Sequence, residues 1–286
     1  MFKIFKNASA DYEESYLPHN RKEAFKDIVK QRYKLLLLLG GILFCFSIPL
    51  IITLILQARI NYNIAFSINA GTIEYQIAIE ELISYKFITN LLVFGSLFVF
   101  LIGTAGCSKI FLKLTYLEGI ILSYDFKEGI RQNYKELVIA ASIMFFIYFV
   151  FDYVSSLILL NQIELLTFMV VLPYAVLILL IIPCFMIYIN LTCIYNDKVS
   201  QKIRNAFYIY TKYFPIVLLF VLMILIHIII YVQPNFIISL IVTFTYFLFL
   251  LPLVLLGWFL FSNKMFDECI NNKFYPNIVG KGLEKF

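Results

Sequence analysis

The sequence has few charged residues: Asp, Glu, Lys and Arg make up 14% of its 286 positions, against about 25% in an ordinary soluble domain. Hydrophobic residues account for 62% of the chain and aromatic residues for 18%. This composition excludes an ordinary soluble enzyme and a disordered tail protein. It also excludes a nucleic-acid reader, because the net charge of +5 arises beside apolar runs and not on a separate basic domain.

Residues that carry catalytic and metal chemistry are scarce as well. The chain has two His, and it contains no P-loop, no G-x-S-x-G and no H-E-x-x-H motif. Its five Cys lack the spacing of a metal site, and they fall in apolar runs or on the side that we expect to be cytoplasmic, where thiols stay reduced. We therefore expect free thiols, no enzymatic activity, no cofactor and no metal.

Long apolar runs are what the sequence has in abundance. Leu35–Ala58 and Phe87–Ser108 contain 24 and 22 residues without a charge, enough for a helix to cross a hydrocarbon core of about 30 Å. The 51 uncharged residues of Tyr213–Asn263 would make a helix of about 76 Å, so the chain must turn back, and Pro234 marks the place. The link at 161–164 divides the preceding run in the same way.

These runs predict an all-α polytopic membrane protein with six transmembrane helices. A cytoplasmic segment 1–34 precedes the membrane domain 35–261, and a cytoplasmic tail 262–286 follows it. The expected spans are about 35–56, 87–107, 137–160, 165–195, 214–232 and 236–261.

The basic residues are distributed unevenly between the two sides that these spans define. Of the 23 Lys and Arg, 21 fall on the side that carries both termini, and 2 fall in the loop 57–86. Because positive charge stays on the cytoplasmic side, we expect a multi-pass plasma-membrane protein with both termini in the cytoplasm. The first 34 residues are highly charged, so Leu35–Leu56 is interpreted as an uncleaved anchor.

Short amphipathic helices are expected outside the spans. Asn20 and Glu23 have the spacing of a capping box, before a basic helix that would lie along the inner leaflet. Residues 125–135 and 200–207 are similar basic segments, each before a span. They serve either as interfacial anchors or as contacts for a cytoplasmic or membrane partner. The loop 57–86 suggests a further short amphipathic helix, which would cap the bundle or rest on lipid headgroups. The candidate partner contacts are Lys127, Arg131, Lys202 and Arg204.

Asp152 is the most informative single residue, because an acid inside a span costs about 2.5–3.5 kcal/mol and usually faces the bundle interior. His227 is the other ionisable, non-phenolic group that we place within a span, at a similar depth. The hypothesis is that Asp152 and His227 form an intramembrane polar pair, or part of a proton or solute path. The alternative is that Asp152 reaches the outer headgroups or accepts bonds from Ser155, Ser156 or nearby Tyr.

Proline and glycine indicate where helices break and where they approach one another. Pro183 in the fourth span leaves the carbonyl of Leu179 without its helical donor, and broken helices can line the substrate sites of transporters. Prolines are also common in membrane helices without such a role. Small residues allow close helix packing; they are Gly40, Gly41, Gly95, Ser96, Gly103 and Gly106.

One stretch resembles a signature of the YesL-like family of bacterial integral membrane proteins, whose molecular function is unknown. It comprises Ile102-Gly103-Thr104-Ala105-Gly106, then Leu112-Lys113, Glu118 and the segment Asp125–Lys135. Ser47-Ile48-Pro49 and Ala206–Pro215 are also similar, and the likeness extends from about residue 30 to 265. The family's Pro after Gly103 is missing, Lys113 replaces the usual Arg, and the loop after the first span is longer than typical.

The resemblance implies a six-span plasma-membrane protein whose family genes often neighbour carbohydrate-uptake and polysaccharide-degradation genes. The first functional hypothesis is therefore an accessory or regulatory subunit associated with solute, in particular carbohydrate, uptake. The second is a secondary transporter of a small solute that uses Asp152, His227 and the broken fourth helix. An intramembrane enzyme acting on lipid is the third, although it would need clustered polar residues at one depth.

Overall fold

The computed structural model describes residues 17–69, 71, 74–160, 172, 175–226 and 236–284 of the chain. Helices and turns account for the ordered elements in these ranges, and none of the residues described is in a strand, so the predicted all-α class is confirmed. The elements are α1 (Arg21–Asn69), α2 (Tyr75–Thr115), α3 (Leu122–Leu160), η4 (Leu177–Ile181), α5 (Ile182–Ile194), α6 (Val199–Leu225), α7 (Phe236–Thr245), η6 (Tyr246–Leu250), α8 (Leu251–Phe266), η7 (Asp267–Asn271), α9 (Asn272–Phe274) and η8 (Pro276–Ile278).

Within the described residues, five helices are long and apolar enough to cross a membrane, and a further apolar helix, Leu179–Ile194, is shorter. Each of the six contains at least part of one predicted span. The first part of the expected fourth span, and the link between the fifth and sixth, lie outside the described residues. The architecture is that of a helical membrane protein.

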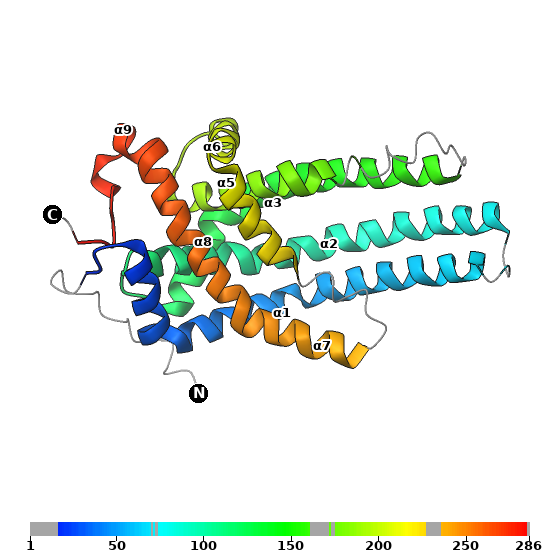
Figure 1. Ribbon diagram of the computed structural model, residues 1–286, viewed down its shortest axis with the longest axis horizontal. Helices are drawn as coiled ribbons and strands as arrows, with labels where there is room; N and C mark the ends of the chain where they lie inside the picture. Colours follow the sequence, from blue (N-terminus) through cyan, green and yellow to red (C-terminus); the bar gives the residue numbers. More distant parts are fainter. Residues whose placement is uncertain are drawn as a thin grey trace.

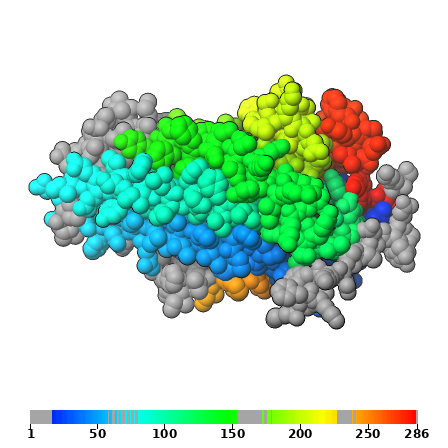
Figure 2. All heavy atoms as spheres, turned by 180° about the vertical axis from the view of Figure 1, so that it is seen from behind, coloured from blue at the N-terminus to red at the C-terminus, as the bar shows by residue number. Residues whose placement is uncertain are grey.

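The three long helices α1, α2 and α3 run side by side along the molecule, while α5 to α9 gather around one half of it (Figure 1). Figure 2 shows from behind how α1, α2 and α3 extend beyond the rest. We call the half with α5 to α9 the terminal end, because the described chain begins and ends there: the Glu284 amide donates to the Pro18 carbonyl at 3.1 Å. The opposite end, around Gly71 and the end of α3, is the hairpin end.

The segment 57–86 differs from the loop expected there. α1 continues to Asn69 and α2 begins at Tyr75, so most of the segment is helical, with Gly71 at a positive φ of 67° in the connection. The expectation was wrong because a charge-free run shows only which part of a helix can lie in lipid. The helix itself can continue into charged residues beyond that run. Past its kink, α1 spans residues 33–69, which is about 55 Å of helix at 1.5 Å per residue.

The predicted basic segments are the first turns of the long helices. The Asn20 cap is confirmed, since Asn20 Oδ1 accepts from the Glu23 amide at 3.0 Å, while the Glu23 carboxylate accepts from the amide of His19, one residue before the cap, at 3.0 Å. A kink at Arg32 follows, and the turns before it run across the long helices in Figure 1. α6 has a similar kink at Tyr213, just before Pro215, which cannot donate a helical hydrogen bond. By contrast, α3 passes through 125–135 and the third span without a break.

The prolines shape the helices around them. Pro183 follows the π-helical turn η4, and the Tyr210 hydroxyl of α6 donates to the carbonyl of Leu179. The carbonyl that the sequence predicted to lack a helical donor therefore gains one from another helix. Pro252 likewise follows η6, and Gly40 of α1 lies against this turn. A Cβ on Gly40 would lie 2.5 Å from the carbonyl oxygen of Phe247.

Within the described residues, helices that follow one another along the chain also pack together: α1 with α2, α3 with α5, and α6 with α8. The first turns of α3 pack on α2, α6 packs on α5, and the first turns of α1 pack on α8, so the third pair closes onto the first. Two buried amides link them: Asn190 of α5 donates to Ser262 of α8 at 2.7 Å, and Asn263 of α8 donates to Thr115 of α2 at 2.9 Å.

Candidate functional site

Asp152 lies on α3 with 3% of its surface exposed, near the hairpin end. Its Oδ1 is 3.0 Å from the ammonium Nζ of Lys86, and its Oδ2 accepts a hydrogen bond from the Asn90 amide at 3.0 Å. Both partners are on α2. A buried carboxylate needs a counter-charge and hydrogen bonds to offset its lost hydration, and Lys86 and Asn90 provide them.

The polar contacts extend to α1 and along α3. The Gln57 amide of α1 donates to Asn90 Oδ1 at 3.3 Å and to the Tyr148 hydroxyl at 3.4 Å. We call Gln57, Lys86, Asn90, Tyr148 and Asp152 the Asp152 cluster. It draws on all three long helices, and polar bonds of this kind hold helices together where lipid removes the hydrophobic driving force.

Nearer the terminal end, α1 and α2 share a further polar contact, in which the Thr53 and Ser96 hydroxyls are 3.2 Å apart. Polar contacts between α1 and α2 therefore continue from the Asp152 cluster toward the middle of the long helices.

The predicted pairing of Asp152 with His227 stays a prediction, because His227 lies outside the described residues. Lys86 was missed as a partner, since it stands at the edge of an apolar run and 66 positions from Asp152. A signal was present in the spacing. Lys86 and Asn90 are four residues apart, as are Tyr148 and Asp152, so each pair shares one helix face.

The four basic residues predicted to contact a partner fall into two groups. Lys127, Arg131 and Arg204 are exposed on α3 and α6. Lys202 is 2% exposed, and its Nζ lies 2.6 Å from the carboxylate of Glu136 on α3. A buried lysine that fixes α6 against α3 is not available to a partner, so the expectation for Lys202 is corrected. Its spacing from Glu136 in the chain gave no indication of this.

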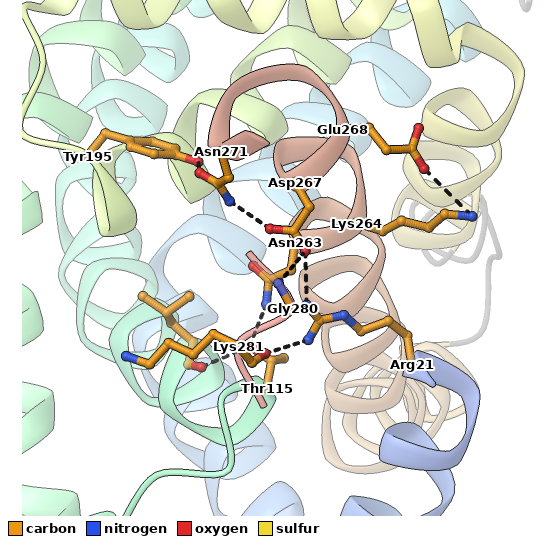
Figure 3. A network of polar contacts seen from close by, with 11 residues as sticks. Arg21, Thr115, Tyr195, Asn263, Lys264, Asp267, Glu268, Asn271, Gly280 and Lys281 are labelled. Atoms are coloured by element: carbon orange, nitrogen blue, oxygen red, sulfur yellow. Dashed lines mark hydrogen bonds and ion pairs between the residues drawn. The ribbon is translucent and has the colours of Figure 1, made fainter. Parts of the chain in front are cut away.

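The segment 262–286 was predicted as a tail, but α8 continues to Phe266 and the residues after it fold back over the terminal end. Figure 3 shows the contacts that hold them, centred on Asp267. Its carboxylate lies 3.2 Å from Arg21 Nη2, accepts from the Asn271 amide at 2.8 Å and accepts from the Gly280 backbone at 3.3 Å. Arg21 also donates to the Lys281 carbonyl at 2.9 Å, so the N-terminal turn and the C-terminal segment are joined.

The same network reaches α5 and the connection after α2. The Tyr195 hydroxyl donates to Asn271 Oδ1 at 2.5 Å. Lys281 Nζ lies 2.6 Å from Glu118 and 4.6 Å from the centre of the Tyr116 ring. The terminal end is thus closed by contacts between residues far apart in the chain.

The stretch 102–135 that carries the family resemblance forms the junction of α2 and α3. A Cβ on Gly106 would lie 2.3 Å from the Phe126 ring, and one on Gly129 would lie 2.7 Å from the Ala105 carbonyl, so the glycines allow contact at these points. Asp125 is fully buried; it lies 2.6 Å from Lys113 Nζ and accepts from the Ile121 amide at 2.8 Å. These residues have a structural role in closing the junction.

A groove of about 910 Å³ lies between the first turns of α1 and the end of α8. Its walls are basic toward the outside of the terminal end and apolar deeper along α8. The residues that line it include Lys22, Lys26, Lys264, Phe25, Gly257 and Phe261. A smaller apolar cavity of about 130 Å³ lies between α3, α5 and α6.

Within the residues that the structure describes, no group of three His, Cys, Asp or Glu is placed to hold a metal ion. Comparison with protein-family models, with curated proteins and with solved structures finds no match for this chain. The geometry of the Asp152 cluster, the terminal end and the groove therefore carries the functional argument.

Proposed function

We propose that the protein is a non-enzymatic accessory or regulatory subunit of a solute-uptake system, in particular one for carbohydrate, in the bacterial plasma membrane. The YesL-like resemblance supports this class. The observation that carries the proposal is the closed terminal end, where Asp267 and Arg21 join the two ends of the described chain. A polar surface that presents exposed basic side chains, including Lys127, Arg131 and Arg204, is suited to a protein partner.

The proposed orientation places the terminal end in the cytoplasm. Its support is the distribution of charge: Arg59 and Lys86 are the two basic residues of the segment 57–86, and Lys86 is already paired with Asp152. To test the orientation, Lys273→Cys is introduced as the single Cys of the chain and is labelled in intact and in permeabilised cells. Labelling only after permeabilisation is expected, and labelling of intact cells would contradict it.

A matched pair of charge reversals tests the partner. Lys127→Glu/Arg131→Glu/Arg204→Glu changes the exposed surface of α3 and α6, and Lys22→Glu/Lys26→Glu/Lys264→Glu makes the same change of charge beside the groove. After mild solubilisation, we expect an uptake component to co-purify with the wild type and the second variant but not with the first. Recovery of the wild type alone under several detergents would refute the proposal.

A secondary transporter is the second candidate, and the buried ion pair of Asp152 and Lys86 favours it. A carboxylate and an ammonium group buried between three membrane helices can gain or lose a proton as a solute or proton passes. Uptake into proteoliposomes by the purified protein, lost in Asp152→Asn, would support this function. Absence of uptake by the wild type with candidate sugars and with a proton gradient would count against it.

A further inference from the structure

Two junctions of the fold are built on the same plan. Residues 25–34 and 126–135 have Phe, Lys, Gln, Tyr and Lys at the same five positions. Phe126 lies over Gly106 of α2, and Phe25 lies near Gly257 of α8, where Phe220 of α6 is closer still. Lys113 follows Gly106 by seven residues, and Lys264 follows Gly257 by the same interval. The start of α1 therefore meets α8 as the start of α3 meets α2.

The two junctions differ in how closely they pack. A Cβ on Gly106 would lie 2.3 Å from the Phe126 ring, but one on Gly257 would lie 3.9 Å from the Phe25 ring. The first junction is closed by direct contact. The groove of about 910 Å³ lies at the second, between the same elements.

They also differ in charge. Lys113 is neutralised by the buried carboxylate of Asp125, which immediately precedes Phe126. The residue before Phe25 is Ala24, which is fully buried and has no charge. Lys264 instead has Glu268 at 3.9 Å on its own helix, with both side chains exposed, as Figure 3 shows. The second junction thus lacks a buried carboxylate at the position of Asp125, and the Asp267 that lines the groove is paired with Arg21.

Two more cations line the groove. Lys22 and Lys26 are exposed on α1, and neither has an ion-pair partner among the described residues. Arg21 and His19 also line it, but they are paired with Asp267 and Glu284. Deeper along α8, toward the membrane-spanning part, the walls become apolar at Phe261 and Gly257, with Phe25 opposite.

We propose that this groove binds an anionic phospholipid of the inner leaflet. Its phosphate lies in the groove near Lys264, Lys22 and Lys26 and supplies the negative charge that Asp125 supplies to Lys113 in the other junction, and an acyl chain lies along Phe25, Phe261 and Gly257. Charge at the outside followed by apolar wall toward the membrane matches a lipid better than a free anion. The proposal rests on the proposed orientation, but it requires no protein partner.

The test uses the full-length protein purified in a neutral detergent and titrated with phosphatidylglycerol or phosphatidylcholine, with bound lipid counted by native mass spectrometry. We expect the wild type to bind phosphatidylglycerol more tightly than phosphatidylcholine. Lys264→Gln should lower the affinity for phosphatidylglycerol about fivefold, which is the effect expected of one lysine near a lipid surface. Lys22→Gln/Lys26→Gln/Lys264→Gln is expected to remove the preference. Lys273→Gln, an exposed lysine outside the groove, is the matched control and should bind as the wild type does.

A second pair of variants tests whether lipid binding depends on the absence of a carboxylate at position 24, the position equivalent to Asp125. Ala24→Asp supplies it and is expected to weaken binding of phosphatidylglycerol, whereas Ala24→Asn has a similar shape without the charge and should weaken it less. The thermal midpoint without lipid confirms that each variant folds; if Ala24→Asp does not, Lys264→Gln against Lys273→Gln decides. Equal binding of the two lipids, a preference kept in the triple variant, or competition by millimolar inorganic phosphate equal to that of the lipid would overturn the proposal.

Discussion

The two ends of α1, α2 and α3 are held together in different ways. At the terminal end, glycines bring helices into contact with neighbouring backbone and aromatic rings, as Gly40 does with Phe247 and Gly106 with Phe126. At the hairpin end, residues such as Phe87 and Phe146 are half or more exposed, and the Asp152 cluster links the three helices. At the terminal end, close packing at glycines acts together with ion pairs such as that of Asp267 with Arg21, whereas the hairpin end has one buried ion pair among lipid-facing side chains.

The largest effect is expected at the hairpin end. Lys86→Met leaves the buried carboxylate of Asp152 without its counter-ion, which is expected to cost about 3–5 kcal/mol of stability. The thermal midpoint of the detergent-purified protein measures it. The double variant Lys86→Met/Asp152→Leu removes both charges and should recover most of the loss. Equal stability of Lys86→Met and the wild type would show that the ion pair does not hold this end together.

At the terminal end, Gly40→Ala is expected to destabilise the protein by about 1–3 kcal/mol, because the added methyl group overpacks the contact with η6. Its neighbour provides the control, since a Cβ on Gly41 meets no atom within 4 Å. Gly41→Ala should leave the thermal midpoint unchanged or raise it slightly. Similar effects of the two substitutions would mean that close approach is not what joins α1 to α8.

A smaller effect is expected where α6 meets the broken helix η4–α5. Tyr210→Phe removes the hydroxyl that donates to the Leu179 carbonyl, a loss of about 1 kcal/mol. Pro183→Ala restores a backbone amide four residues after that carbonyl, so Tyr210→Phe should destabilise less in a Pro183→Ala background. A double-mutant cycle on thermal unfolding measures the coupling, and strict additivity would contradict the link.

The smallest effect is expected at the exposed surface of the terminal end. Lys281 and Glu118 are both partly exposed, and water screens their attraction, so Lys281→Ala is expected to change stability by about 1 kcal/mol or less. Arg21→Ala should have a larger effect, since Asp267 is less exposed and holds several groups. The thermal midpoints of the two variants measure these losses of stability. A larger loss in Lys281→Ala than in Arg21→Ala would show that the network is not centred on Asp267.

Much of the fold could be predicted from local patterns. Charge-free runs located the apolar helices, Asn20 and Glu23 located the start of α1, and Pro183 identified the carbonyl that needs another donor. The connection at 57–86 was predicted wrongly, because helical hydrogen bonding continues beyond the charge-free runs on either side of it.

The candidate sites were less predictable. Asp152 was identified from its position in an apolar run, but its partner Lys86 lies 66 residues away and on another helix. Lys202 was interpreted as a surface residue, yet it is buried against Glu136. The groove depends on how closely α1 approaches α8, and a spacing of residues along the chain does not fix a distance between helices.

The sequence by itself determined the helical class, the order of the apolar helices and the uneven placement of positive charge, because periodicity and composition act within a single turn or span. Only the tertiary structure decided which charges are neutralised and which face a groove. Asp125 and Asp152 are both acids near apolar runs, and each is matched by a lysine of α2, which lies 12 residues away for Asp125 and 66 residues away for Asp152. That matching depends on the register and tilt of packed helices, which no local stretch of residues specifies.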